Sequence, residues 1–448
     1  MVGQASSAQS KSPSGHGPSG PPPFSTALAY WFRLGLISFG GPAGQISIMQ
    51  TDLVERRGWI AQGPFLSGLN FAMLLPGPEA QQLATYIGWR LHGLKGALAA
   101  GILFVAPGAV VLGVLAWLAA AHGETPVVAA LFDGFRPVVV AIIACALWRL
   151  SRRSLKSAAA WALAVAAFAA LAIFQVPFPL VVGAALLAGA LSARAFPGLF
   201  TFGHGGGEEP HADFVGTGGG GLRRVAGLVL IFAVLWAAPV ALVVAALGVN
   251  PWAGIAELFT KAAFVTFGGA YAVLPYVAAE AVEHYRWLSS DDMINGLALA
   301  ETTPGPLILV TQWIGWFAGY NHAGALSPVL AGVIGAALTT YVTFLPCFLF
   351  ILAGAPYVDR VARNTHAAAA LGAVTAAVVG VIASLGVYIG RASLFPEAAR
   401  GDWSPDPFAV AAALAATSVL LFTRIGIPWI VLAGGAAGIA ARMTGLTG

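Results

Sequence analysis

The chain has 448 residues, of which 58% are hydrophobic and only 9% are charged, and its formal net charge is +4. Soluble globular proteins carry roughly 25% charged residues, so this composition excludes a soluble protein. The apolar runs are about 20 residues long and rich in Ala, Leu, Val and Gly, unlike the alternating strands of a membrane β-barrel. We therefore expect an all-α polytopic protein with about 10–13 segments in the lipid bilayer.

Taken in chain order, the sequence divides into two long apolar regions. Residues 1–23 are rich in Gly, Ser and Pro and predict a disordered tail rather than a cleaved signal peptide. We then expect a first repeat at 24–196, a flexible Gly-rich linker at 197–224, an extra transmembrane helix at 225–248 and a second repeat at 249–448. The apolar runs place segments near 25–50, 64–90, 94–121, 126–149, 157–175, 178–196, 225–248, 252–279, 292–319, 326–354, 367–390, 407–423 and 426–442.

Two motifs occur once in each region, at the same spacing. Residues 39–41 read Phe-Gly-Gly and residues 76–78 read Pro-Gly-Pro; the same motifs recur at 267–269 and 304–306. The offset is 228 residues for both pairs, and no gap is needed between them. Each motif places helix breakers inside an apolar segment. In a membrane protein this pattern predicts interrupted helices and a ligand site between the repeats.

Six segments, one extra span and six more segments would place the two repeats in opposite orientations. With the N-terminus inside, most Lys and Arg residues, Arg286 among them, fall on the cytoplasmic side, as the positive-inside rule requires. We therefore predict that residues 150–156 face the cytoplasm and residues 391–406 the outside. Arg56 and Arg57 fit this scheme poorly, and they would fit better if the first two segments entered the membrane without crossing it.

Glycines that break a membrane helix expose backbone N–H groups, and the N-terminus of the following half-helix attracts anions. Four such ends would arise, two in each repeat. The alternative is a kink that serves packing alone, because Gly and Pro are common in membrane helices. On the first interpretation, the backbone candidates for substrate binding are Gly40, Gly41, Gly77, Gly268, Gly269 and Gly305, with Gln45 as a nearby side chain.

Three basic residues lie inside apolar segments, where a buried cation is expensive. Arg33 and Lys261 occupy equivalent positions, six residues before Phe39 and Phe267, and we expect them to flank an anion. The alternative is that both snorkel toward the membrane surface. Arg136 follows Asp133 by three residues, a spacing that predicts a local ion pair on one helical face.

Two carboxylates lie next to the Pro-Gly-Pro motifs. Glu79 follows the first motif and Glu301 precedes the second, although the two positions are not equivalent. A carboxylate near the bilayer midplane is a candidate proton carrier; for Glu79 the alternative is a favourable charge at a helix N-terminus. We expect no metal and no cofactor, since the pair His204 and His211 has poor spacing for zinc. The two cysteines, Cys145 and Cys347, lie in apolar segments and imply no disulfide framework.

These motifs together resemble the long-chain, two-repeat members of the chromate ion transporter family. The resemblance covers roughly residues 25–442 and rests on the motifs at 39–42, 55–59, 75–78, 96–100, 267–269, 273–275, 287–288 and 304–306. It implies a bacterial plasma-membrane exporter of chromate built from two homologous halves of opposite orientation. The sequence departs from many members at Gln45 and Ala270, and this leaves sulfate, a close structural relative of chromate, as an alternative substrate.

The favoured hypothesis is a secondary anion transporter that works by alternating access and confers chromate resistance. The alternatives are a carrier for sulfate or another oxyanion, a membrane-embedded enzyme, and a cation exchanger. No clustered Asp, His and Ser constellation favours the enzyme, and no paired midplane carboxylates favour the exchanger. The basic residues serve orientation rather than nucleic-acid binding. A homodimer is one candidate assembly.

Overall fold

The structure is a computed structural model that describes residues 21–39, 41–195, 199–200, 221–358 and 364–445. These residues form helices and no strands, which confirms the all-α membrane fold. The predicted tail lies outside them for residues 1–20, as do Gly40 and most of the predicted linker. In chain order the helices are α1 (Phe24–Ile37), α2 (Gly41–Met49), η1 (Gln50–Arg56), α3 (Gln62–Leu74), α4 (Glu79–His122), α5 (Pro126–Ser154), α6 (Ala158–Ala172), α7 (Phe178–Ala195), α8 (Leu222–Leu247), α9 (Trp252–Val265), α10 (Ala270–Ala279), η2 (Glu280–His284), α11 (Ser290–Thr302), η3 (Leu307–Leu309), α12 (Val310–Asn321), α13 (Pro328–Gly354), η4 (Ala355–Tyr357), α15 (Thr365–Leu394), η5 (Pro396–Arg400), α16 (Pro407–Phe422) and α17 (Ile427–Met443).

The first two segments of the first half fold back as hairpins whose turns are the breaker motifs. Before the first Phe-Gly-Gly motif, Tyr30 of α1 packs against Trp59, which follows η1, with ring centroids 5.4 Å apart. Around the first Pro-Gly-Pro motif, α3 and the start of α4 lie so close that a Cβ at Gly68 would overlap the Tyr86 ring. Each hairpin therefore returns to the side on which it began.

The second half repeats both hairpins with equivalent contacts. Gly254 of α9 lies against the ring of Trp287, the counterpart of Trp59. Gly296 of α11 lies against the ring of Trp313 in α12, just as Gly68 lies against Tyr86. Gly68 and Gly296 are again 228 residues apart. Small residues at these positions let the two arms of a hairpin approach closely.

The other segments are apolar helices of two lengths. Five described helices, α4, α5, α8, α13 and α15, meet length and hydropathy criteria for a span, and α6, α7, α16 and α17 are shorter apolar helices. Helix α4 contains a sharp bend at His92 and Gly93, where the hairpin arm ends and a long helix over 94–122 begins. The thirteen predicted segments are thus four hairpins and nine helices.

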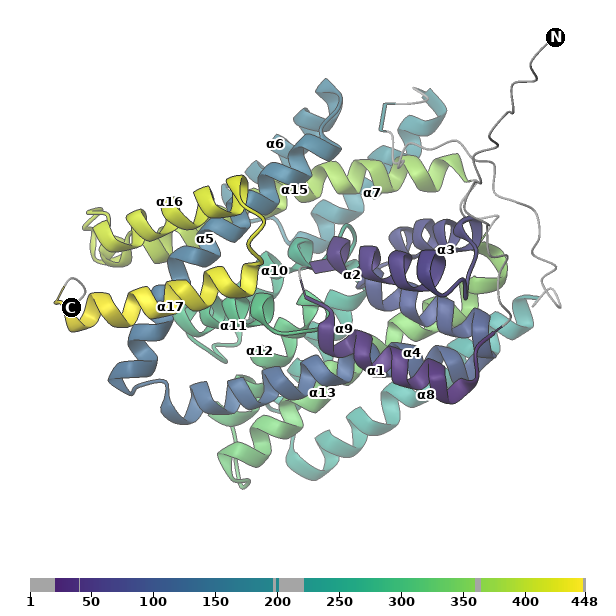
Figure 1. Cartoon of the computed structure of the whole chain (residues 1–448), viewed down its shortest axis with the longest axis horizontal. Helices are drawn as coiled ribbons and strands as arrows, with labels where there is room; N and C mark the ends of the chain where they lie inside the picture. The colour runs from purple at the N-terminus through teal and green to yellow at the C-terminus, as the bar shows by residue number, and fades with distance from the viewer. Residues whose placement is uncertain (1–20, 40, 196–198, 201–220, 359–363, 446–448) are drawn as a thin grey trace, which may run out of the picture.

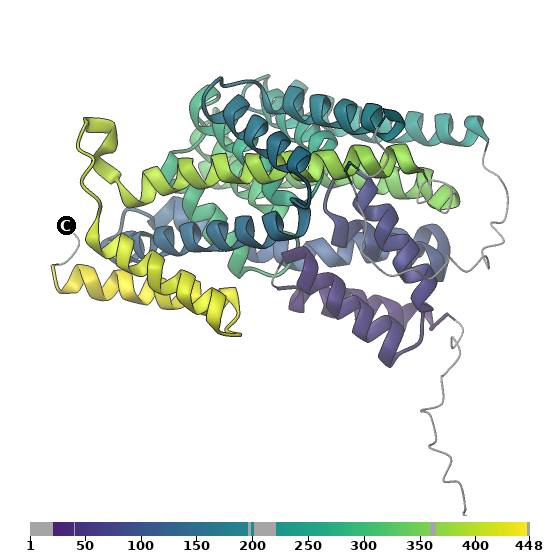
Figure 2. The same cartoon turned by 90° about the horizontal axis from the view of Figure 1, so that it is seen from above.

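The last helices of each half pack on the other half. Helix α5 lies beside α16 and α17, whereas α15 lies beside α6 and α7 (Figure 1; Figure 2). Gly438 of α17 packs on the Ala130 carbonyl of α5, and Gly189 of α7 packs on the Ala369 carbonyl of α15. Since Gly438 follows Gly189 by 249 residues and Ala369 follows Ala130 by 239, the two contacts are equivalent. The halves are therefore interlocked rather than merely adjacent.

Contacts between distant residues define two faces of the molecule. We call the face near the chain start the amino-terminal face. There His92 Nε2 lies 2.7 Å from the Pro22 carbonyl oxygen. On the opposite face, Ser290 and Tyr388 share a hydrogen bond of 3.0 Å.

The hairpins correct the charge assignment made from the sequence. Arg57 stacks on Tyr30 and Trp59, so the chain has returned to the amino-terminal face at this point, and the poor fit of Arg56 and Arg57 disappears. Arg286, which the sequence assigned to the cytoplasmic side, lies between η2 and α11 on the opposite face. Both changes in the assigned face have one cause: a broken apolar segment turns back where an unbroken segment would cross the membrane.

Candidate functional site

The breaker motifs of the two halves bind each other through backbone hydrogen bonds. The Gly77 N–H donates to the Thr266 carbonyl at 2.7 Å, and the Gly305 N–H donates to the Ser38 carbonyl at 2.9 Å. Each Pro-Gly-Pro turn of one half thus holds the residue just before the Phe-Gly-Gly motif of the other. All four hairpin tips meet where the halves face each other, and this junction is the candidate site.

Local chemistry shapes the tips. The Ser38 hydroxyl donates to the Leu34 carbonyl at 2.5 Å, and the Thr266 hydroxyl donates to the Ala262 carbonyl at 2.6 Å, so both side chains are satisfied within their own helix. The glycines that follow adopt positive φ angles, 71° at Gly41, 76° at Gly268 and 100° at Gly269. Residues with a Cβ rarely adopt such angles, so these turns require glycine.

Two prolines inside crossing helices receive the Pro-Gly-Pro turns. Pro107 in α4 and Pro346 in α13 are equivalent positions, 239 residues apart. The residue after each proline lies against the turn of the other half: a Cβ at Gly108 would overlap the Pro304 carbonyl, and a Cβ at Gly77 would lie 2.9 Å from Cys347 Sγ. Cys347 is therefore a packing residue at the site, consistent with a small buried hydrophobe.

Gln45 strengthens only one of the two contacts between halves. Its side-chain amide is fully buried and donates to the Ser38 carbonyl at 3.1 Å and to the Gly305 carbonyl at 2.7 Å. The equivalent residue of the second half is Val273, which cannot donate. Near the other contact, Gln82 instead donates to the Pro76 carbonyl of its own turn at 2.6 Å. The predicted substrate-binding residue Gln45 thus lies at the site as a clamp between the halves.

The predicted glycines converge, but their N–H groups differ in availability. Gly77 and Gly305 already use theirs in the bonds between the halves, so the open donors lie in the first turns of the helices that follow. Gly41, Gly268 and Gly269 lie at the tips themselves. Gly40 lies outside the described residues.

The two carboxylates have different surroundings. Glu301 is 6% exposed, and its carboxylate accepts a hydrogen bond from the Tyr271 hydroxyl. Glu79, the first residue of α4, has no hydrogen bond or ion pair to another described residue; the charge that acts on it comes from Arg153 of α5. Both carboxylates lie beside a Pro-Gly-Pro turn, but Glu301 alone links two hairpins of the same half.

The two predicted cations do not reach the junction. The Lys261 side chain is 58% exposed and forms an ion pair of 2.5 Å with Glu257, four residues earlier in α9. Arg33 likewise lies on the exposed side of α1. Both positions agree with the snorkelling alternative, since a long side chain one turn or more before the tip can extend along the helix surface.

The predicted pair between Asp133 and Arg136 is present, at 3.3 Å, and it belongs to a larger cluster on the opposite face. Arg136 also binds Asp291 at the start of α11 at 3.2 Å, and Arg442 of α17 lies 3.8 Å from Asp133. The cluster joins α5 to two helices of the second half. It lies on the opposite face and not at the hairpin tips.

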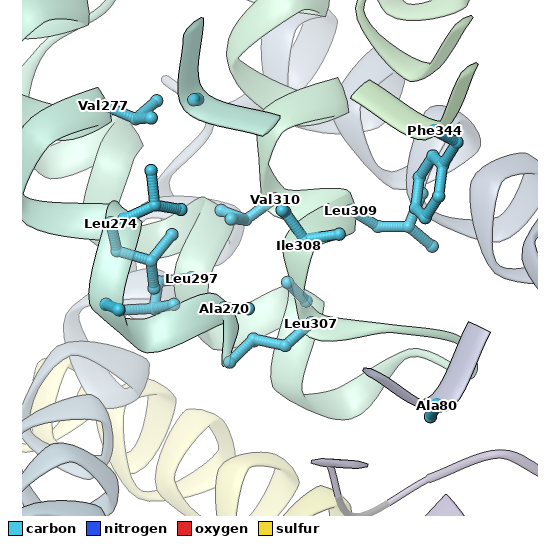
Figure 3. Close-up of a cluster of buried hydrophobic side chains, with 14 of the residues drawn as sticks. Ala80, Ala270, Leu274, Val277, Leu297, Leu307, Ile308, Leu309, Val310 and Phe344 are labelled. Carbon is cyan, nitrogen blue, oxygen red and sulfur yellow. The ribbon is translucent and has the colours of Figure 1, made fainter. Parts of the chain in front are cut away.

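Apolar side chains surround the second-half tips. Figure 3 shows Ala270, Leu274, Leu297 and Leu307 close together, contributed by α10, α11 and η3, with further labelled residues from α4, α12 and α13. This packing keeps the turn at 304–306 dry, so charge there must be balanced locally.

A cavity of about 750 Å³ lies between α4, α12 and α13, beside the site rather than at it. Two of its polar lining groups are already paired: Gln312 donates to the Ala109 carbonyl at 2.7 Å and Tyr341 donates to the Leu235 carbonyl at 2.6 Å. The buried indole N–H of Trp316 has no partner, but a single neutral donor among mostly apolar side chains does not suit a dianion. Within the described part of the chain, no cluster of His, Cys, Asp and Glu could hold a metal ion; His204 and His211 lie outside that part.

Sequence reasoning missed Tyr271 and the partner carbonyls of Ser38 and Thr266. A signal for Tyr271 exists, because a tyrosine directly after a helix break, in an apolar helix, needs a hydrogen-bond partner. The carbonyls carry no such signal, since every residue has one. Their role depends on how the halves meet.

Comparison with known proteins shows relatives that match both halves of the chain. A family model described as Chromate transporter matches residues 26–190 and 253–439, which are the two halves without the linker and α8. A chromate transport protein of Pseudomonas aeruginosa is 32% identical over 372 residues, covering 81% of this chain and 80% of that one. One from Cupriavidus metallidurans is 27% identical over 420 residues, covering 92% of both chains.

A probable chromate transport protein of Synechococcus elongatus is 29% identical over 365 residues, covering 82% of this chain and 84% of that one. No solved structure matches the chain. The family model spans both halves and includes all four breaker motifs. The chain therefore belongs to the chromate transporter family.

Proposed function

We propose that this protein exports chromate across the bacterial plasma membrane by alternating access and thereby confers chromate resistance. The observation that carries the proposal is that four broken hairpins meet between the two halves of the chain. Both halves also match the chromate transporter family model. Ligand sites of transporters with repeated halves are commonly formed by interrupted helices at the repeat interface.

The proposed topology has nine crossing helices and four hairpins that enter the membrane and return. The amino-terminal face would be cytoplasmic, because it carries most of the basic loop residues. These are Arg56, Arg57, Arg90, Lys95, Arg149, Arg152, Arg153, Lys156, Arg194, Arg223, Arg224 and Arg424. Among the described residues, the opposite face carries the basic residues Arg136, Arg286, Arg391, Arg400 and Arg442. Four crossings in the first half and one by α8 bring the second half to the opposite face, so the halves are inverted.

In the proposed site, the oxyanion lies among the hairpin tips and binds to backbone N–H groups of the half-helices that begin there. The tip glycines allow the close approach that such donors need, and Gln45 holds two tips in register. Arg33 and Lys261 would act at the membrane surface and attract anions without contacting the bound one.

The coupling step is proposed to involve the two carboxyl groups beside the turns, Glu301, which is buried, and Glu79, which is partly buried. A charged carboxylate in this apolar junction lacks a cationic partner within hydrogen-bond distance, so a proton is the simplest way to neutralise it. Glu301 lies at the turn of the second half and Glu79 at the turn of the first, where each could exchange a proton when its side opens.

Sulfate is the second candidate substrate. It shares the tetrahedral shape and double charge of chromate, and backbone donors recognise both features. Gln45 favours this alternative, because the position departs from many members of the family.

The test measures chromate flux into inside-out vesicles that contain the purified protein, with and without excess sulfate and with and without a proton uncoupler. We expect saturable chromate entry that requires the protein and that the uncoupler changes. Strong inhibition by sulfate, together with sulfate flux of equal size, would favour the broader oxyanion carrier. Vesicles with folded protein and no flux of either anion would contradict the proposal.

A further inference from the structure

Tyr271 is the second residue of α10, directly behind the second Phe-Gly-Gly motif. Its hydroxyl donates to the carboxylate of Glu301, three residues before the second Pro-Gly-Pro motif. One hydrogen bond therefore joins the two hairpins of the second half next to their tips. The equivalent positions in the first half are Ala43 and Met73, which cannot form such a bond.

The surroundings of this pair make it sensitive to protonation. Glu301 is 6% exposed, and among the described residues Tyr271 is the titratable group that contacts it. Arg149 of α5 acts on Tyr271 from a distance, and no ion pair joins Glu301 to a described residue of α4, α5, α12, α15 or α17. The Tyr271 hydroxyl is thus the main compensation for a buried negative charge.

We infer that Tyr271 is a substrate-binding residue. Its hydroxyl donates to Glu301 when the site is empty and to the transported oxyanion when the site is loaded. With Glu301 ionised, its carboxylate accepts the Tyr271 hydrogen bond and repels a second anion. With Glu301 protonated, the hydroxyl is released to donate to the oxyanion, and the repulsion is gone. This inference rests on the proposed function and adds a residue and an order of binding to it.

The charge balance follows from this order. One proton binds Glu301 as a dianion binds at the tips, and both leave on the far side. The loaded site then carries the two negative charges of the substrate, and one turnover moves a net charge of minus one, because one proton accompanies the dianion. A membrane potential that is negative inside drives such a charge outward, which agrees with export.

Three variants separate this role from a structural one. Tyr271→Phe keeps the ring and removes the donor. Glu301→Gln keeps the shape and is permanently neutral. Tyr276→Phe is the matched control, because it removes a hydroxyl from the same helix. The Tyr276 ring stacks on Phe178, and its hydroxyl has no hydrogen bond to another described residue.

The experiment measures chromate half-saturation in inside-out vesicles between about pH 6 and pH 8.5, with folded protein quantified by size-exclusion chromatography. We expect Tyr271→Phe to raise half-saturation about tenfold, as for one lost hydrogen bond to an anion, while Tyr276→Phe matches the wild type. In the wild type, half-saturation should rise with pH more steeply than in Glu301→Gln. Protonation of chromate itself affects both proteins alike, so the difference between the two pH profiles reports the protonation of Glu301.

Equal half-saturation in Tyr271→Phe and Tyr276→Phe would overturn the role of Tyr271. Parallel pH profiles of wild type and Glu301→Gln would overturn the proton-dependent order. If Tyr271→Phe yields too little folded protein, Glu301→Gln alone decides through its pH profile. Absence of chromate flux in the wild type at every pH contradicts the proposed function instead, so the two failures are distinct.

Discussion

The two hairpin pairs of this transporter have the same backbone and different side chains. Each Pro-Gly-Pro turn donates its glycine N–H to the other half, at 2.7 Å from Gly77 and 2.9 Å from Gly305. Around Gly305, Gln45 adds two hydrogen bonds between side chain and backbone, and Tyr271 and Glu301 join the neighbouring hairpins. Around Gly77, no described side chain from the second half donates to the turn, although Cys347 packs on it.

The difference separates what the fold requires from what the function adds. Features present in both halves, the tip glycines and the prolines at 107 and 346, form the junction. Other features have no counterpart in the opposite half: Gln45 of the first half, and Tyr271 and Glu301 of the second. These three residues give the turn at 304–306 its polar and titratable surroundings. Substitutions at shared positions should therefore abolish transport, and substitutions at unshared positions should change affinity or pH dependence.

The largest effect is expected at the shared glycines. Gly77 has φ 118° and Gly305 has φ 99°, so valine at either position is strained, and at Gly77 its Cβ would also crowd Cys347. We expect Gly77→Val and Gly305→Val to abolish chromate flux while the protein still enters the membrane, because insertion depends on hydrophobicity summed over the segment. Flux and monodisperse protein are measured together. Normal flux from well-folded Gly305→Val would show that the junction does not need this turn.

The second-largest effect is expected at Gln45, which has no polar counterpart in the second half. Gln45→Leu leaves the Gly305 carbonyl without its buried donor, which should cost about 1–3 kcal/mol of stability or conformational preference. We expect a several-fold loss of flux and a lower melting temperature in detergent. Ile46→Leu, an isosteric change in the same helix, is the control and should cost less than about 1.5 kcal/mol. Equal behaviour of the two variants would mean that Gln45 does not clamp the halves.

A smaller effect is expected on the opposite face. Arg136→Gln removes the cation between Asp133 and Asp291, whose side chains are 33% and 55% exposed. Solvent screens partly exposed charges, so the loss of stability should be about 1 kcal/mol or less and should shrink in high salt. The melting temperature at low and high salt measures this. A large loss that salt does not change would assign Arg136 a role other than charge pairing.

The smallest effect is expected at the two exposed cations. Arg33→Gln and Lys261→Gln should leave chromate half-saturation within about twofold of the wild type, because exposed ion pairs and side chains contribute little. Flux at several chromate concentrations decides this. A tenfold loss of affinity in both variants would restore the interpretation of these residues as ligands of the anion.

The repeated motifs, their spacing and the pair of Asp133 with Arg136 could all be predicted from the sequence, because each rests on local chemistry and helical periodicity. The hairpins were indicated only for the first two segments, by the poor fit of Arg56 and Arg57, since an apolar run of the same length can cross the membrane or turn back at a break. The signal from Lys261 was incomplete: Glu257, four residues earlier on the same helix, is the partner that competes with an anion.

Contacts between distant segments were also beyond the sequence. Tyr271 and Glu301 meet across thirty residues because two hairpins are packed side by side. The bonds from Gly77 and Gly305 depend on backbone atoms that carry no residue identity. Such contacts follow from the packing of the halves, which no local pattern encodes.

The most direct test of the central claim is the sidedness of the hairpin ends. Single cysteines at Ala61, Arg152, Glu283 and Ser404, in a chain with Cys145→Ala and Cys347→Ala, are labelled with a membrane-impermeant thiol reagent from each side. The account predicts labelling of Ala61→Cys and Arg152→Cys from the cytoplasm, and of Glu283→Cys and Ser404→Cys from the outside. Labelling of Ala61→Cys from the outside would show that the first segment crosses the membrane, and labelling of Arg152→Cys and Ser404→Cys from one side would contradict inverted halves.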